Sequence, residues 1–482
     1  LAEELPSTGK GTWVVRPDGT MQTTYRLRPN VTWHDGTPLT AEDLAFGWAV
    51  TSDPALPVES KAASSEIARI EAPDDHTLLI EWQRLYVQAY AITEDDLGPF
   101  ASHLLRPLYE ADKQQMWGSP YWTTMFVGVG PFKLMEWQPG EHILLHAYDG
   151  FFGGRPRVDQ IVIRFIPSQD TIVANLLART VDFDTGKGRT TLQQKIEIRN
   201  AWQQAGLQPT VLTSTGNLQI LWVQYGHPVV PELTDARVRR ALLLALDRQT
   251  MADTLTDGLA PVADTFLPPD DLRWDWVKDG IARYPYDSRQ ADALFAESGL
   301  RRGPDGVLVN AAGARMDLPH WTVPGTSHEQ QLAIEADNWR GAGVLTQQKI
   351  QSPSEANDVR TIAGFSGLYQ TVWPTPTLAS IEARFLPSKC PSEQNNWTGQ
   401  NYGCYLNPAW EQVMGQLKAA LDPSDQRAPY LAAARLHTED LPFFTLYFDV
   451  NLEVLRPGIT GVKGVAKPDG DLTWNLPQWD IE

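Results

Sequence analysis

The feature that most constrains the fold of this chain is a recurring order in which a strand-like segment is followed by a helical one. Strand patterns at Val158–Ile166, Leu218–Val223 and Asp317–Thr322 each precede a helical pattern. The helical patterns cover Gln169–Arg179, Asp235–Leu246 with Arg248–Leu255, and Glu329–Trp339. Alternation of this kind is typical of layered α/β structure. We therefore predict an α/β fold, with a short β run at Thr361–Phe365 and a last strand at Phe443–Leu455.

The length of 482 residues exceeds what one hydrophobic core usually serves, so we expect two or three domains. Hydrophobic residues make up 42% and charged residues 21% of the chain, which is typical of a packed globular protein. No low-complexity linker or internal repeat is visible. The domains are therefore expected to interleave along the chain.

The charge of the chain excludes several classes of partner. The net charge of −19 argues against a surface that neutralises phosphates, so we predict no nucleic-acid partner. No apolar run approaches the roughly 18 residues of a membrane-spanning helix. The sequence starts at Leu1 without a targeting segment, which we expect to have been removed or to lie outside this sequence.

The two cysteines, Cys390 and Cys404, lie in a polar stretch with 13 residues between them. Two cysteines alone make neither a structural zinc site nor, at this spacing, a Cys-x-x-Cys redox pair. We predict a local disulfide, worth about 3 kcal/mol for a loop of this length and typical of an exported protein. Two free buried thiols are the alternative.

The search for catalytic and metal-binding patterns is negative. Gly364-Phe365-Ser366-Gly367 lacks the Gly-x-Ser-x-Gly spacing of a nucleophile elbow. His142 and His146 lie in a strand pattern, where residues four apart stand roughly 13 Å from each other. Acidic pairs such as Asp74-Asp75 are typical of solvated turns. We predict no catalytic residue, metal ion or cofactor, and keep a hydrolase with an acid pair as an alternative.

One long segment resembles a known family. Residues 27–44 read LRPNVTWHDGTPLTAEDL, which is similar to the signature of the solute-binding proteins of oligopeptide and dipeptide ABC importers. Asp35-Gly36 predicts a tight turn, and Thr40 with Asp43 predicts a capping box at the start of a helix. The signature therefore describes architecture and not ligand chemistry.

Four later segments resemble the same family in the expected order. They are Gly128–Gly140, Tyr148–Pro167, Asp235–Arg248 and Asn396–Pro408. The resemblance implies a periplasmic-binding-protein type II fold, with two lobes, a hinge and a smaller extra domain that close on a ligand. It implies an extra domain at 1–126, lobe I at 127–215, lobe II at 216–446 and a return to lobe I at 447–482. Family members carry further N-terminal strands, so the resemblance also implies that the N-terminal part of lobe I is missing here.

The resemblance also bears on the ligand. In peptide-binding members a carboxylate follows a Gly-Trp-type segment and pairs with the ligand's ammonium group. The matching segment here is Ala363–Tyr369, and Leu368 stands where the carboxylate is expected. Because a buried ammonium without a counter-charge is costly, either another acid substitutes or the ligand has no amine there.

The candidate ligand-binding residues come from two regions of the predicted lobe II. They are Trp222, Tyr225, Arg360, Gly364, Phe365, Ser366, Tyr369 and Trp373. The aromatic residues are candidate walls for a sugar ring, an aromatic solute or an apolar peptide side chain, and core packing is the alternative for each. Arg360 is a candidate partner for a ligand carboxylate, with a surface salt bridge as its alternative.

These inferences predict a monomeric extracytoplasmic receptor that delivers a peptide or similar small solute to a membrane ABC permease by lobe closure. It is expected in the periplasm or outside the cell, with a lipid anchor left open. Peptide comes first as the ligand, and an oligosaccharide or other uncharged solute is the alternative. A receptor that signals to a membrane partner also fits the sequence.

Overall fold

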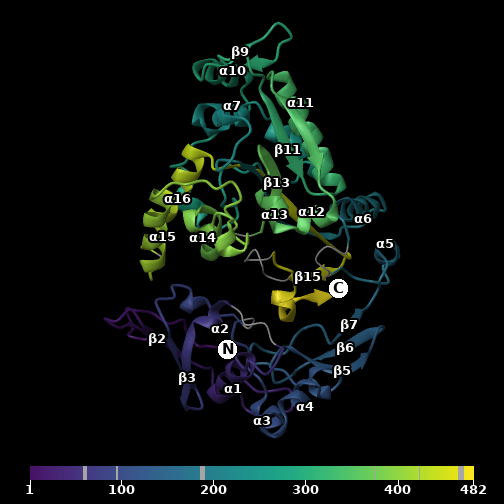
Figure 1. Ribbon diagram of the computed structural model, residues 1–482. Helices are drawn as coiled ribbons and strands as arrows, with labels where there is room; N and C mark the ends of the chain where they lie inside the picture. The colour runs from purple at the N-terminus through teal and green to yellow at the C-terminus, as the bar shows by residue number, and fades with distance from the viewer. Residues whose placement is uncertain are drawn as a thin grey trace.

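The computed structural model describes residues 1–57, 62–93, 96–184, 190–374, 376–422, 424–464 and 472–481. Within them the chain forms two bodies joined by two long strands, β8 (Thr210–Val223) and β14 (Phe443–Leu455) (Figure 1). We call the residues between these strands the upper body, and the residues before β8 with those after β14 the lower body. The mixed α/β architecture predicted from the sequence is confirmed.

The first part of the lower body is a four-stranded antiparallel sheet with helices packed on it. Its strands are β1 (Trp13–Val15), β2 (Met21–Arg26), β3 (Ile67–Asp74) and β4 (Thr77–Trp82), in the order β1-β2-β4-β3. The helices are α1 (Ala41–Thr51), α2 (Ala62–Glu66), α3 (Ser102–Ala111) and α4 (Lys113–Trp117). The predicted capping box at Thr40 and Asp43 is present at the start of α1.

The second part of the lower body is an antiparallel sheet of β5 (Phe132–Gln138), β6 (His142–Ala147) and β7 (Gln160–Arg164). Most of its side chains are partly or fully exposed; Met135 on β5 is 51% exposed and Val162 on β7 is 53% exposed. The helices α5 (Gln169–Leu177) and α6 (Leu192–Gln204) follow, and they pack with the lower end of β14 around Trp202. A short pair, β15 (Ile459–Thr460) and β16 (Asp480–Ile481), completes the lower body.

The upper body is built on a five-stranded mixed sheet in the order β12-β11-β13-β8-β14. The strands β11 (Asp317–Thr322), β12 (Leu345–Ile350) and β13 (Leu368–Trp373) are parallel, whereas β8 runs antiparallel to β13 and β14. A small hairpin of β9 (Arg301–Arg302) and β10 (Leu308–Val309) lies at the far end of this body (Figure 1).

Two core clusters cover the two faces of this sheet, because residues alternate between faces along each strand. The helices are α7 (Ala236–Leu244), α8 (Arg248–Thr256), α9 (Trp274–Val277), α10 (Ser288–Glu297), α11 (Thr326–Gly341), α12 (Pro353–Asn357), α13 (Val359–Ala363), α14 (Leu378–Phe385), α15 (Ala409–Ala419) and α16 (Arg427–Asp440). Figure 1 shows α12, α13 and α14 along the edge of the upper body that is nearest the lower body. Among the described residues, no helix combines the length and apolar character needed to cross a membrane.

The two joining strands remain paired along nearly their whole length. The register runs from Phe443 opposite Trp222 in the upper body to Leu455 opposite Thr210 in the lower body. It shifts between Thr445 and Val450, which marks an irregularity in the middle of β14. Such irregularities bend a strand pair locally.

Several predicted elements agree closely with the structure, and one is wrong. The strands predicted at Asp317–Thr322 and Phe443–Leu455 are confirmed to the residue. The β run predicted at Thr361–Phe365 is instead the helix α13 and the turn after it. Asp358 caps this helix by accepting hydrogen bonds from the amides of Arg360 and Thr361, which outweighs the β preference of the branched residues nearby.

Candidate functional site

Four of the predicted site residues lie on one face of the upper sheet, within one core cluster. Trp222, Phe365, Tyr369 and Trp373 are between 0% and 2% exposed. Side chains this deeply buried contact protein and not solvent in this conformation. We call these four side chains the aromatic floor. They pack in the core next to α13 and α14, and more exposed side chains separate them from solvent.

The exposed edge of this aromatic floor carries polar groups. The Trp222 Nε1 donates a hydrogen bond of 3.2 Å to Thr371 Oγ1, and the Trp222 ring meets the Tyr402 ring edge-on at 5.5 Å. Thr371 and Tyr402 are partly exposed, so they connect the buried indole to the surface. Burial raises the pKa of the Tyr402 hydroxyl, so this group is a neutral hydrogen-bond donor at physiological pH.

Arg384, near the end of α14, lies over the same floor. Its guanidinium carbon stands 4.7 Å from the centre of the Trp373 ring, and its Nη1 donates to Gln400 Oε1 at 3.0 Å. Burial lowers the pKa of this guanidinium to about 10, partly offset by the nearby Tyr402. Sequence analysis missed Arg384 and Tyr402, because no spacing in the chain indicates that Arg384 contacts Trp373 or that Tyr402 contacts Trp222.

Tyr225, just after β8, makes packing and hydrogen-bond contacts within the protein. Its hydroxyl donates to the Leu441 carbonyl oxygen at 2.9 Å, and its ring lies between Tyr405 and the guanidinium of Arg239. Burial raises the pKa of the Tyr225 hydroxyl well above its usual range. Tyr225 thus joins the end of β8 to the end of α16 within the upper body, and its ring packs against the same core cluster as Trp373.

Gly364, Ser366 and Arg360 lie on or just after α13, at the edge facing the lower body. Gly364 is exposed and ends the helix, and the Ser366 carbonyl oxygen accepts a hydrogen bond of 3.0 Å from the Val229 amide. Arg360 is exposed, and its charge contributes to the lowered pKa of Asp358, whose largest cause is the hydrogen bond from Thr361. The helix α13 thus lies at the edge of the upper body that faces the lower body (Figure 1). No contact between Arg360 and the four aromatic residues is found among the described residues.

Leu368 is fully buried on the opposite face of the sheet, in the cluster beneath α11. Because neighbouring residues of a strand point to opposite faces, Leu368 and Tyr369 belong to different cores. In this structure the position that the resemblance aligns with a ligand-binding carboxylate is a packing position.

The predicted disulfide between Cys390 and Cys404 is confirmed. It closes a loop that lies on the end of β8, where the Tyr225 amide donates to the Gly403 carbonyl oxygen at 2.8 Å. The same loop carries Gln400 and Tyr402, which border the aromatic floor. The disulfide therefore holds two polar groups of the candidate site in place.

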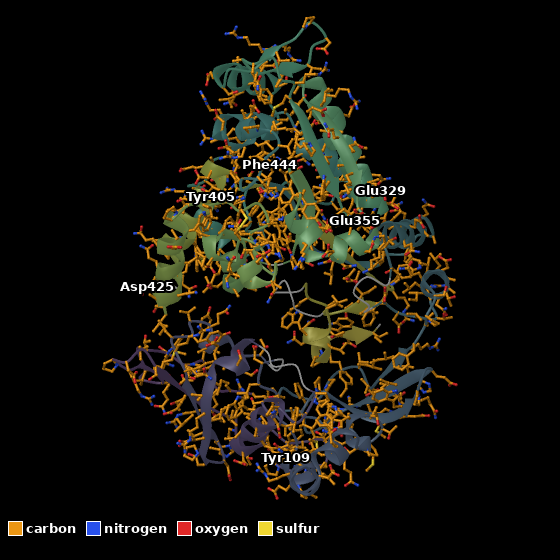
Figure 2. The ribbon with its side chains drawn as sticks, viewed as in Figure 1. Tyr109, Glu329, Glu355, Tyr405, Asp425 and Phe444 are labelled. Carbon is orange, nitrogen blue, oxygen red and sulfur yellow. A yellow bond between two sulfur atoms is a disulfide. The ribbon has the colours of Figure 1, made fainter. Side chains whose placement is uncertain are left out.

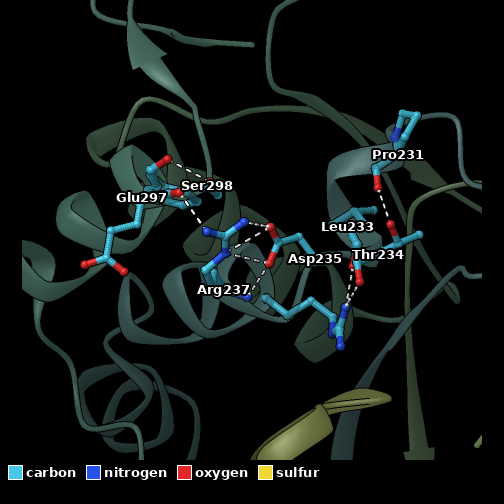
Figure 3. Close-up of polar contacts among 9 residues, drawn as sticks. Pro231, Leu233, Thr234, Asp235, Arg237, Glu297 and Ser298 are labelled. Carbon is cyan, nitrogen blue, oxygen red and sulfur yellow. Dashed lines mark hydrogen bonds and ion pairs between the residues drawn. The ribbon is translucent and has the colours of Figure 1, made fainter. Parts of the chain in front are cut away.

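The helix start at Asp235 illustrates how a motif can be purely structural (Figure 3). The Asp235 side chain accepts from the Arg237 amide at 2.8 Å and pairs with the Arg237 guanidinium. The Arg237 Nη1 also donates to the Glu297 carbonyl oxygen at 2.8 Å. These contacts cap α7 and attach it to the end of α10, far from the candidate site.

The signature at residues 27–44 likewise has an architectural role. The Trp33 Nε1 donates to the Asp43 carboxylate at 3.2 Å, and the His34 amide donates to the Gly128 carbonyl oxygen at 2.9 Å. The first contact holds the signature segment together, and the second joins it to the segment that leads into β5. In the part of the chain that the structure describes, no group of three or more His, Cys, Asp or Glu side chains is arranged to hold a metal ion.

Comparisons with known proteins agree with this architecture. The oligopeptide-binding protein AppA of Bacillus subtilis is 24% identical over 475 residues, covering 96% of this chain and 81% of AppA. The dipeptide-binding protein of Escherichia coli is 25% identical over 312 residues, covering 60% of this chain and 54% of that protein.

Solved structures share the fold at low identity. HbpA2 of Haemophilus parasuis superposes with a TM-score of 0.77 at 20% identity, covering 100% of this chain and 90% of HbpA2. AppA of Bacillus subtilis in complex with a nonapeptide superposes with a TM-score of 0.61 at 22% identity, covering 98% of this chain and 89% of AppA. NikZ of Campylobacter jejuni in complex with Ni(L-His) superposes with a TM-score of 0.66 at 18% identity, covering 97% of this chain and 89% of NikZ.

The profile of the bacterial extracellular solute-binding proteins, family 5, middle region, matches residues 6–379, which is most of the chain. The resemblance inferred from the sequence motifs is therefore confirmed, and this chain belongs to family 5 of the bacterial extracellular solute-binding proteins.

Proposed function

We propose that this protein captures a peptide between its upper and lower bodies and delivers it to a membrane ABC permease. Relatives named as oligopeptide- and dipeptide-binding proteins support peptide as the ligand class. The observation that carries the proposal is the polar, partly exposed edge at Thr371, Arg384 and Tyr402, which lies over an aromatic floor in the upper body. Aromatic walls with a few polar groups are typical of sites for small organic ligands.

The eight residues predicted from the sequence remain part of this proposal, with different roles. Gly364, Ser366 and Arg360 are the accessible members, because they lie at the edge near the lower body. Trp222, Phe365, Tyr369 and Trp373 are proposed as the floor that shapes the site. Tyr225 is proposed to support the end of β8.

The second candidate ligand is an oligosaccharide or another uncharged solute. The burial of Leu368 favours it, because the position aligned with an ammonium-binding carboxylate carries no charge. Members of this fold bind chemically different ligands, as the nonapeptide of AppA and the Ni(L-His) of NikZ illustrate. The alternative of a hydrolase is set aside, because the family consists of solute-binding proteins and not of enzymes.

We also propose the domain division 1–126, 127–215, 216–446 and 447–482, with closure about the irregular middle of β14. The proposed lobe I includes the β5-β6-β7 sheet, whose exposed apolar residues support the proposal that further strands cover it. A pocket of about 500 Å³ on this sheet, lined by residues including His142, Arg164 and Phe165, is open on the same surface. We propose that the receptor acts as a monomer outside the cytoplasm, in the periplasm or attached to the membrane by lipid.

A thermal-shift panel tests the ligand class directly. The protein is heated with free tripeptides, N-acetylated tripeptides and oligosaccharides, each at several concentrations. A ligand at about 100 times its dissociation constant stabilises the folded state by about 2.7 kcal/mol, which is readily measured. Stabilisation by peptides supports the proposal, whereas stabilisation by oligosaccharides alone transfers it to the second candidate.

A further inference from the structure

Arg384 has fewer hydrogen-bond partners than Arg239 and Arg273, two other arginines of the upper body. A guanidinium group carries five N–H donors and no acceptor. In Arg384, Nη1 donates to the Ser380 carbonyl oxygen at 3.2 Å and to Gln400 Oε1 at 3.0 Å. Nε is covered by protein and has no hydrogen-bond partner, and no bond of Nη2 to a described residue is found.

Two neighbouring arginines show how this protein satisfies a buried guanidinium elsewhere. Arg239 donates four hydrogen bonds to the carbonyl oxygens of Leu233, Thr234 and Asp440. Arg273 pairs with the Asp271 carboxylate and also donates to the Tyr430 hydroxyl at 2.8 Å. In both arginines, all three guanidinium nitrogens donate to a partner within the protein, whereas in Arg384 only Nη1 donates to a described residue.

No carboxylate compensates the charge of Arg384 within the described residues. The nearest acid along the helix, Glu382, pairs with Lys418 at 2.6 Å. The acceptors that Arg384 does have, a carbonyl and an amide oxygen, are neutral. A partly buried cation without an anion is unfavourable, and burial accordingly lowers the pKa of this guanidinium.

The surroundings of Arg384 match the shape of a carboxylate site. The guanidinium lies over the Trp373 ring, which fixes its plane, and the Tyr402 ring borders the same floor. The helix α14 that carries Arg384 lies at the edge of the upper body nearest the lower body (Figure 1). The Nη2 group has two N–H donors that no described residue accepts, and a charge-assisted hydrogen bond from a guanidinium to a carboxylate is stronger than one to a neutral oxygen.

We infer that Arg384 binds a carboxylate group of the captured solute, with Trp373 beneath the guanidinium and Tyr402 beside it. This inference rests on the proposed function and narrows it, because it assigns an acidic group to the ligand. For a peptide, the carboxylate is the free C-terminus or an acidic side chain. For a ligand other than a peptide, it is the acid group of a small organic acid.

The test compares acids with their amides. The probes are Ala-Phe-Ala with free ends, the same tripeptide with a C-terminal amide, and the smaller pair phenylacetate and phenylacetamide. Dissociation constants are measured by titration calorimetry for the wild type, R384Q, R384K and R340Q. Arg340 is the matched control, because it is exposed on α11 and pairs only with Asp337.

The expected result is that the wild type and R340Q bind an acid about 10- to 100-fold more tightly than its amide, as a charge-assisted hydrogen-bond pair requires. R384Q loses this preference. R384K keeps part of it, because lysine retains the positive charge but lacks the planar guanidinium group. Should R384Q fail to fold, the reduced preference in R384K decides the question.

Other results separate the inference from the proposed function. Equal binding of the acid and the amide of Ala-Phe-Ala to the wild type, or an acid preference that survives in R384Q, overturns the inference and leaves a peptide receptor. Binding of phenylacetate alone, dependent on Arg384, supports the inference and contradicts the peptide proposal. Absence of binding by all four probes contradicts the carboxylate site.

Discussion

At the scale of single residues, Asp449 is the most unusual acid of the joining strands. It lies in the irregular part of β14 and accepts hydrogen bonds of 3.0 and 2.9 Å from Gln219 Nε2 on β8. Burial raises the pKa of this carboxyl to about 6, partly offset by the Gln219 hydrogen bonds. The carboxyl therefore titrates at mildly acidic pH, in the irregular part of β14.

The sign of the resulting pH dependence follows from linkage. The pKa in the folded state is raised above the ordinary value of 3.8, so the folded protein holds the proton more tightly than the unfolded chain. The stabilisation is complete below about pH 4 and is lost as the pH rises through about 6. Asp449→Asn should therefore gain stability relative to the wild type between pH 4 and 6, on the order of 2 kcal/mol.

Urea unfolding at pH 4, 5, 6 and 7, followed by tryptophan fluorescence, measures this difference. Asp425→Asn is the matched control, because Asp425 is exposed on the surface of the upper body (Figure 2). The Asp425 variant should follow the wild type at every pH. A constant offset between Asp449→Asn and the wild type would show that Asp449 does not titrate differently in the folded state.

At the scale of elements, the disulfide loop connects the candidate site to the sheet. Gly403 brings the loop so close to β8 that a Cβ atom there would lie 2.2 Å from the Val223 carbonyl oxygen. That contact is with backbone, which cannot rotate away as a side chain does. The loop position therefore depends on glycine at 403 as well as on the disulfide.

We expect Gly403→Ala to destabilise the protein by about 1–3 kcal/mol, because the loop or the end of β8 must shift. Gly415→Ala on α15 is the matched control, since no atom lies within 4 Å of the Cβ position there. Alanine in that exposed helical turn should stabilise by up to about 1 kcal/mol. Thermal unfolding of the two variants measures both effects, and equal stability of the variants would refute the close-contact argument.

Removing the disulfide should loosen the same loop without unfolding the protein. The double variant Cys390→Ser/Cys404→Ser is expected to lose about 3 kcal/mol, the value for closing a loop of this length. Hydrogen exchange should increase at residues 390–404 and leave the lower body unchanged. An increase spread over both bodies would contradict a local role.

At the scale of the whole molecule, the two bodies are joined by the paired strands β8 and β14. Most buried clusters belong to one body, but Leu421 and Leu259 of the upper body pack against two clusters of the lower body. In the closure that we propose, the bodies move as rigid units about these strands. Ligand binding should then change the distance between the bodies and no distance within either.

Spin labels on cysteines introduced at Glu110 on α3 and Arg289 on α10 measure that distance. The two native cysteines form the disulfide, so labels attach only to the new thiols. Both positions are exposed and lie in different bodies. We expect saturating peptide to shorten this distance and narrow its distribution. The distance between labels at Arg289 and Ala333, both in the upper body, should not change and serves as the control. An unchanged distance between Glu110 and Arg289 would contradict closure.

The sequence by itself determined the α/β class, the family and the position of the return strand Phe443–Leu455. These follow from local patterns: alternation along strands, caps at helix starts and signature turns such as the one at Asp35-Gly36. The pairing of Cys390 with Cys404 was also predictable, because the two residues are close along the chain.

Only the tertiary structure decided which aromatic residues are floor and which side chains are accessible. Trp222, Tyr369 and Trp373 are buried because α14, the disulfide loop and α16 pack over that face of the sheet, and no local pattern contains that packing. Arg384 lies over Trp373 and close to Tyr402, whose ring contacts Trp222, because separate segments of the chain converge there. Whether a side chain is buried, and whether it lacks a counter-charge, depends on which distant segments pack around it. Both properties therefore arise only when the chain is folded.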